Sequence, residues 1–196
     1  MNKIPTLSKA QEMLEEAVLF NPGNWKEHSL IVASCAEKIA KNISYLDPEV
    51  AYILGLLHDI GRRYGVTAMR HIYDGYKYLT ANNYDSSARI CLTHSFPIKP
   101  IESYSGKNDC TIEEIKFIKQ YLQNVEYTDY DKLIQLCDAL AYPTGVCTVE
   151  KRLIDVAIRN GINLYSVDKW KAFLGLRDYF SQKINKSIYE LFEIVL

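Results

Sequence analysis

The stretch Ile53–Arg63, ILGLLHDIGRR, decides the fold of this chain. Its apolar residues follow a helical period as far as Leu57, and His58 and Asp59 come directly after them. Gly61 is expected to end the helix as a C-terminal cap does. A core helix is therefore predicted to carry an imidazole and a carboxylate side by side at its end, and both groups are good metal ligands.

The first of the four histidines lies on the apolar face of another expected helix, at residues 24–42. His28 is in register with the apolar residues of that helix and is expected to point inward. Asn24 and Glu27 have the spacing of a capping box, which predicts the start of the helix. One inward histidine by itself is typical of an ordinary core residue with a hydrogen-bond partner.

Two more histidines and a late aspartate are also expected to face the core. His71 falls on the same side of its helix as Gly75, and the glycine leaves room for a neighbouring helix or an ion. His94 follows Ile90 by one helical turn. Asp138 lies in an apolar helix, where a carboxylate is rarely buried unless it is paired or bound to a metal.

Taken together, four histidines and two aspartates on converging helices are hard to satisfy with protein partners alone. We therefore predict a buried metal site. Its expected ligands are His28, His58, Asp59, His71, His94 and Asp138. A mixture of imidazole and carboxylate ligands favours Fe, Mn, Ni, Co or Zn over Mg.

Helical periodicity dominates the chain, and no segment alternates for long enough to predict a sheet. The fold class is therefore expected to be all-α. A length of 196 residues suits one domain with one core. Asp47-Pro48 and Thr111–Glu114 have the spacing of helix starts. The expected helices cover about residues 7–19, 24–42, 48–59, 67–82, 85–95, 111–123, 129–142, 148–160, 167–184 and 187–195.

The composition restricts the classes of partner. The formal net charge is −1, which gives no argument for a nucleic-acid or membrane surface. The N-terminus is polar and soon acidic, unlike a secretion signal, and no stretch approaches the roughly 18 apolar residues of a membrane span. Five cysteines without a CxxC pair argue against a disulfide framework. We expect a cytoplasmic monomer or homodimer.

The order of the expected ligands resembles that of the HD superfamily of metal-dependent hydrolases. The resemblance covers roughly Pro22–Pro143, and its best-matched pieces are LLHDIGR, the segment 72–79 after His71, ICLTHS and LIQLCDAL. It resembles the longer, two-metal form of the motif. The first ion is implied to lie among His28, His58, Asp59 and Asp138. The second ion is implied to lie among His71, His94 and a bridging Asp59.

The last segment, from Thr148, holds amphipathic helices and contains no histidine, which suggests domain limits. Residues 1–147 are expected to form the HD domain with its N-terminal helix. Residues 148–196 are expected to form a helical C-terminal extension that packs on the same core, with dimerisation as a second use.

The activity implied by this resemblance is a metal-dependent phosphohydrolase acting on a small, nucleotide-type substrate. A metal-bound hydroxide would cleave a phosphate ester or anhydride, since two cations lower the pKa of a water and neutralise the phosphate. Asp59 and Arg62 are the expected catalytic residues. Because cations stabilise charge on the leaving oxygen, Arg62, Lys99 and Lys107 are expected to bind substrate. Both lysines lie in the long loop 95–110, the expected rim or lid of the pocket.

Other readings of the motif stay open. The chain resembles small bacterial hydrolases of diadenosine tetraphosphate in length and ligand order, but departs from them between His94 and Asp138. The GYP segment of HD-GYP cyclic dinucleotide phosphodiesterases is absent, since Lys77 follows Gly75-Tyr76, and (p)ppGpp hydrolases resemble the single-metal form. An HD-type di-iron oxygenase has a very similar ligand set. A metal-stabilised regulatory module would bind a nucleotide without turnover.

Overall fold

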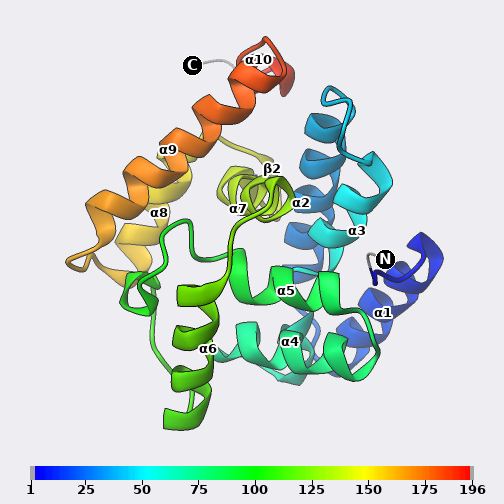
Figure 1. The fold of residues 1–196 in the computed structure, drawn as a ribbon, viewed down its shortest axis with the longest axis vertical. Coiled ribbons are helices and arrows are strands. Elements are labelled where there is room, and N and C mark those ends of the chain that lie inside the picture. Colours follow the sequence, from blue (N-terminus) through cyan, green and yellow to red (C-terminus); the bar gives the residue numbers. More distant parts are fainter. Residues whose placement is uncertain (1–2, 195–196) are drawn as a thin grey trace.

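The computed structural model describes residues 3–194, and almost all of its secondary structure is helical (Figure 1). The helices are α1 (Leu7–Phe20), α2 (Trp25–Ala40), α3 (Pro48–Leu57), η1 (Ile60–Tyr64), α4 (Arg70–Ala81), α5 (Asp85–Thr93), η2 (Ile101–Ser103), α6 (Ile112–Asn124), α7 (Asp129–Leu140), α8 (Val149–Asn160), α9 (Ser166–Lys183) and α10 (Ile188–Leu191). The prediction of an all-α fold is confirmed. Residue 195, expected in the last helix, lies outside the described residues.

One small sheet was not predicted from the sequence. Strand β1 (Ala141–Tyr142) pairs antiparallel with β2 (Gly145–Val146), with Ala141 opposite Val146. Two-residue strands are too short to show alternation, so they leave no periodic signal. The hairpin ends α7 at Leu140, earlier than the expected 142.

Helix α7 lies at the centre of the molecule, with α2 and α3 on one side and α8 and α9 on the other (Figure 1). The largest buried apolar cluster joins both sides through Ile39, Leu136, Phe173 and Phe180. Residues from α2 and α7 thus share one core with residues from α9. The C-terminal helices therefore pack on the same core as α2 and α7.

The start of α4 is fixed from another part of the chain. The carboxylate of Asp109 accepts hydrogen bonds from the backbone N–H groups of Ala68, at 2.7 Å, and Arg70, at 2.8 Å. The helix consequently begins at Arg70 rather than at the expected residue 67. The loop 95–110 is thereby attached to α4.

The capping boxes have mixed outcomes. The box at Thr111 and Glu114 is present at the start of α6. The expected box at Asn24 and Glu27 is wrong, because the backbone of Asn24 is already helical and its side chain makes no capping hydrogen bond. A capping side chain normally belongs to a residue with extended backbone, as at Thr111.

Gly61 does not cap α3, which corrects the expectation from the sequence. It lies buried in η1 and does not have the positive φ of a C-cap glycine. A Cβ at this position would lie 1.9 Å from the carbonyl oxygen of His71 and 2.4 Å from the backbone nitrogen of Gly75. At Gly75 itself, a Cβ would lie 2.9 Å from the Sγ of Cys91. These glycines let η1, α4 and α5 approach closely, and atoms of the neighbouring elements fill the space beside them.

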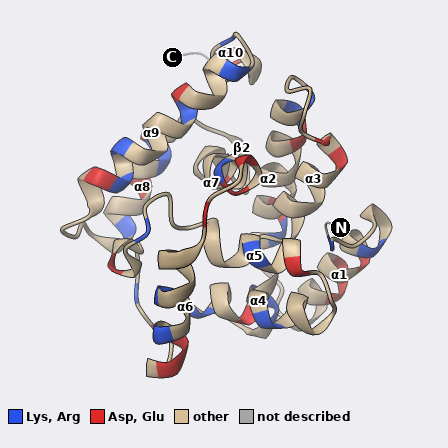
Figure 2. Cartoon of the chain, in the orientation of Figure 1, with Lys and Arg blue, Asp and Glu red and all other residues tan. Residues whose placement is uncertain are grey.

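The outer surface carries mixed charge. Basic and acidic residues are interspersed along the helices in Figure 2 instead of gathering by sign. Within residues 3–194, no helix combines the length and the apolar character needed to cross a membrane.

Candidate metal centre

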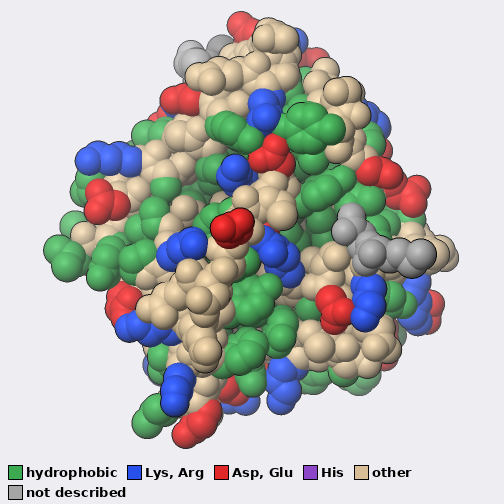
Figure 3. Space-filling view, in the orientation of Figure 1, with side chains coloured by type: hydrophobic (Ala, Val, Ile, Leu, Met, Phe, Trp, Pro, Cys, Tyr) green, Lys and Arg blue, Asp and Glu red, His purple; other side chains and the backbone are tan. Residues whose placement is uncertain are grey.

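The six predicted ligands come from five helices and meet in the interior. His28 belongs to α2, His71 to α4 and Asp138 to α7, while His58 and His94 are the C-cap residues of α3 and α5. All four histidines are buried. None of them is visible on the face of the molecule in Figure 3.

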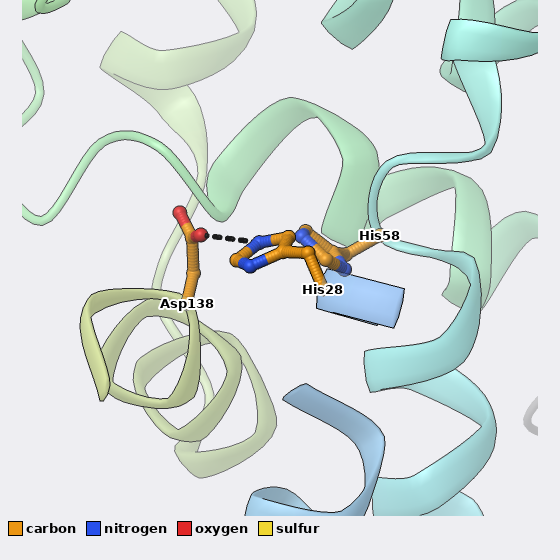
Figure 4. A group of neighbouring side chains, drawn as sticks. All are labelled: His28, His58 and Asp138. Atoms are coloured by element: carbon orange, nitrogen blue, oxygen red, sulfur yellow. Dashed lines mark hydrogen bonds and ion pairs between the residues drawn. The ribbon is translucent and has the colours of Figure 1, made fainter. Parts of the chain in front are cut away.

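The first group consists of His28, His58 and Asp138 (Figure 4). One potential ligand atom from each lies within 4.8 Å of the others. The Nε2 atom of His28 is 3.0 Å from Oδ1 of Asp138, and the rings of His28 and His58 pack edge to face with centroids 5.3 Å apart. One cation can therefore be held by two imidazoles and one carboxylate.

The second group consists of His58, Asp59 and His94, and His71 joins it through Asp59. The Oδ1 atom of Asp59 is 3.0 Å from Nε2 of His71 and 3.6 Å from Nε2 of His94. The residue common to the two groups is His58, whereas the resemblance implied a bridging Asp59. The other oxygen of Asp59 faces Arg62, whose Nε lies 2.5 Å away.

Three imidazoles are oriented by the same kind of backbone contact. The Nδ1 atoms of His58 and His94 lie 2.7 Å from the carbonyl of Gly55 and 3.0 Å from that of Cys91. His71 contacts Ala68 in the same way, and each carbonyl belongs to the residue three positions earlier. Because a carbonyl only accepts, Nδ1 carries the proton and Nε2 keeps its lone pair.

The residues fit a bound cation. Nε2 of His58, Nε2 of His71 and Oδ1 of Asp59 are buried and have no hydrogen-bond donor. The last two atoms lie 3.0 Å apart, but both are acceptors when Nδ1 of His71 carries the proton. A buried polar atom without a partner costs about 1–3 kcal/mol, so three of them in one place are expected only where a ligand satisfies them. Histidine and carboxylate donors in this number suit divalent transition metals.

Burial sets the charge state of the histidines. It lowers the pKa of His58 and of His71, and it lowers the pKa of His94 to about 4. These imidazoles are consequently neutral at pH 7 and can donate a lone pair to a metal.

The two carboxylates remain ionised despite their burial. Burial alone would raise the pKa of Asp59, but the guanidinium of Arg62 beside it holds this pKa well below its usual range. Burial likewise opposes ionisation of Asp138, but the hydrogen bond from His28 and nearby cations such as Arg152 keep its pKa low. Both groups can therefore act as anionic ligands.

The centre opens into a cavity of about 730 Å³. His28, Asp59, His71, His94 and Asp138 form part of its wall. A cavity of this size accommodates a small organic molecule.

The three predicted substrate residues have different positions. Arg62 and Lys107 line the cavity. Lys99 does not, and its Nζ lies 3.4 Å from the carbonyl of Gln123 at the end of α6, so its prediction as a substrate contact is not supported. The loop 95–110 does form part of the wall, through residues that include Tyr104 and Lys107.

Some residues of the cavity were missed by sequence reasoning. Arg152 and Arg159 on α8 and Lys169 on α9 all line it. Arg152 Nη2 is 3.9 Å from Oδ1 of Asp138. In the sequence, the basic residues of α8 look the same as those of any solvated helix face, and no signal distinguished them.

These features define a class of protein, a helical domain with a buried histidine and aspartate centre suited to divalent metals. The model of the HD domain family matches residues 25–142, which is more than half of the chain. The chain therefore belongs to the HD domain family, which is of the metal-dependent hydrolase type. All six expected ligands lie in the matched part. The prediction of the family is confirmed. No curated protein and no solved structure matches the chain.

Proposed function

We propose that this protein is a metal-dependent phosphohydrolase that cleaves a phosphate ester or anhydride of a small, nucleotide-type substrate. The observation that carries the proposal is the set of partnerless ligand atoms, on His58, His71 and Asp59, at one side of a cavity with basic residues in its wall. Metal ligands beside a pocket with excess cations suit a phosphorylated substrate.

Two divalent transition metal ions, Fe, Mn, Ni, Co or Zn, are proposed for the centre. His28, His58 and Asp138 would hold one, and Asp59, His71 and His94 the other, with His58 close to both. Bound cations would supply a water of lowered pKa and neutralise the negative charge of the phosphate.

Arg62 has two proposed roles. Its Nε holds the carboxylate of Asp59, which fixes the direction of Oδ1 toward His71 and His94. Its side chain is 30% exposed and lines the cavity, so the remaining guanidinium N–H groups can donate to a phosphate oxygen. Lys107 is proposed as a second phosphate contact from the loop.

A nucleotide is supported by the aromatic side chains of the cavity. Trp25, Tyr104, Tyr142 and Trp170 all contribute to its wall. Aromatic rings next to a phosphate site can stack on a base. We also propose that the HD domain ends at residue 147 and that the C-terminal extension begins at residue 148. Helix α9 of the extension then lies next to Tyr104 of the HD domain.

The test combines metal analysis with a substrate screen. Protein loaded with Mn or Co under anaerobic conditions is incubated with mononucleotides, dinucleoside polyphosphates and cyclic dinucleotides, and released phosphate or nucleotide product is measured. Anaerobic turnover would exclude an oxygenase, whereas oxygen consumption by an iron-loaded form without any hydrolysis would refute the proposal. Tight nucleotide binding without turnover would favour the regulatory module.

Variants test the ligand assignment. Asp59→Ala is expected to abolish turnover and lose at least one ion with the helical circular dichroism signal retained. Asp168→Ala, whose side chain is 69% exposed on α9, is the matched control and should keep both. His94→Ala should reduce occupancy of one ion more than the other, and equal loss of both would contradict the two-site partition.

A further inference from the structure

Lys169 is a buried cation without an acidic partner. Only 6% of the residue is exposed, and its Nζ lies 3.1 Å from the carbonyl of Ser103 and 3.3 Å from Oγ of Ser105. Among residues 3–194 the structure gives this ammonium no carboxylate within ion-pair distance, and Asp138 acts on it only as a more distant charge. Lys169 nevertheless lines the cavity.

A buried ammonium is costly unless an anion compensates it. Burial lowers the pKa of Lys169 to about 8, so the side chain still carries its charge in most molecules at pH 7. Two neutral oxygens, from Ser103 and Ser105, occupy two of its three N–H donors. One donor and the full positive charge stay available to a ligand in the cavity.

The cavity that Lys169 lines has an excess of basic over acidic side chains in its wall. Arg152, Arg159 and Lys107 line the same cavity, and Asp155 is the carboxylate that α8 contributes to it. Asp155 is shared by both arginines, since Oδ2 lies 3.6 Å from Nη1 of Arg152 and 2.9 Å from Nη2 of Arg159. Arg152 also lies 3.9 Å from Asp138, so two carboxylates, Asp155 and Asp138, face four basic side chains in this cavity.

This charge exceeds what a single phosphate needs. A phosphate at the metal centre would be neutralised by the bound cations and Arg62, which leaves the basic side chains of the wall in excess of their carboxylates, Asp155 and Asp138. We propose that Lys169 anchors a second phosphate group of the substrate, so that the substrate is a bisphosphorylated small molecule with its two phosphates apart. This rests on the proposed function, because it takes the metal centre as the site of the first phosphate.

The test measures binding, which does not require turnover. Manganese-loaded protein is titrated by calorimetry with monophosphates and bisphosphates of propane-, butane- and hexanediol. At one or more chain lengths, we expect the bisphosphate to bind at least tenfold more tightly than its monophosphate. Lys169→Gln should reduce this preference to threefold or less and leave monophosphate affinity within threefold of wild type.

Two further variants separate charge from structure. Lys171→Gln, on the same helix with a side chain that is 74% exposed, should keep the preference. Lys169→Arg, which keeps the charge, should retain a preference above threefold. If Lys169→Gln keeps the wild-type preference, or if Lys169→Arg folds and loses it entirely, the anchor is wrong.

A measurement on the unmodified protein covers the case in which Lys169→Gln does not fold. Lysines are acylated with an amine reagent at pH 8, and mass spectrometry follows Lys169 and Lys171. The bisphosphate should slow acylation of Lys169 at least fivefold more than the monophosphate and leave Lys171 unchanged. Equal protection by both compounds would overturn the proposal.

The two proposals can fail separately. A bisphosphate preference that depends on Lys169, in a protein that releases no phosphate from any substrate, refutes the hydrolase and keeps the anchor. Hydrolysis of monophosphates by a wild-type protein without bisphosphate preference refutes the anchor and keeps the hydrolase.

Discussion

The replacement of Gly61 by alanine is expected to damage both stability and the metal centre. A Cβ on Gly61 would lie 1.9 Å from the carbonyl oxygen of His71, whereas real Cβ contacts under 3.0 Å essentially do not occur. Helix η1 and α4 must therefore separate by about 1 Å. The obstructing atoms are backbone atoms, so no side-chain rotation can relieve the overlap, and we expect a loss of about 3 kcal/mol, at the upper end for overpacking.

The same displacement acts on the metal centre. Asp59 directly precedes η1 and His71 lies in α4, so the separation lengthens the 3.0 Å distance between Oδ1 and Nε2. Shifts of about 1 Å in a catalytic geometry can cost about 100-fold in rate. We therefore expect Gly61→Ala to lower turnover about 100-fold and to reduce metal occupancy.

The assay is urea unfolding followed by circular dichroism, with metal content measured by mass spectrometry on the same preparation. Gly175→Ala is the control, since Gly175 lies inside α9 and a Cβ there would meet no heavy atom within 4 Å. Because alanine favours a helix over glycine, this control should gain about 0.5–1 kcal/mol. A Gly61→Ala variant within 0.5 kcal/mol of wild type and with full metal content would refute the reasoning.

Two further predictions concern the loop 95–110 and α9. Asp109→Ala should cost about 1 kcal/mol, measured by urea unfolding at pH 7, because the carboxylate caps the start of α4 through Ala68 and Arg70. Burial would raise the pKa of Asp109, but these backbone hydrogen bonds lower it. The loss of stability caused by Asp109→Ala should therefore vanish as the pH falls through that lowered pKa. An unchanged loss at pH 2 would contradict the capping role. Burial lowers the pKa of Lys169 from 10.5 to about 8. Because the unfolded chain binds more protons than the folded protein between these pH values, the free energy of unfolding should rise with pH. Metal-free wild type should gain about 1 kcal/mol between pH 7 and 9 relative to Lys169→Gln, and equal slopes for the two proteins would refute the shift.

The sequence predicts the helices well because their signal is local. A 3.6-residue period and capping residues such as Thr111 are properties of short windows, and the structure has helices in each expected region. The inward positions of His28 and His71 follow from the same period. Most of the candidate centre could be predicted because each ligand lies on the apolar face or at the end of a helix.

Features that depend on tertiary distances could not be predicted. Gly61 follows the apolar helix in the sequence, as a cap would, and only the approach of α4 gives it a different role. Lys99 and Lys107 lie in the same loop, yet only Lys107 lines the cavity. Lys169 resembles any lysine of an amphipathic helix until α9 is packed beside the loop 95–110. Helical periodicity says which face is buried, but not which other segment buries it.

The way the histidines are held explains how a helical fold prepares a metal centre. The last four carbonyls of an α-helix have no intrahelical partner. Gly55 and Cys91 are among the last four residues of α3 and α5, and their carbonyls accept from His58 and His94 at the C-caps. Each histidine thus satisfies a helix end and, in doing so, has its Nε2 lone pair fixed toward the centre.

His28 is held differently, which assigns it a distinct place in the centre. Its Nδ1 is buried and has no hydrogen-bond partner, and its Nε2 contacts Asp138 at 3.0 Å. The backbone therefore does not fix its tautomer, and the ring depends on Asp138 for its orientation. Because Asp138 comes from α7, in the middle of the core, the first group is complete only when α2 and α7 are packed. Metal binding at this group and packing of the central helices should consequently be coupled, since each stabilises the same arrangement.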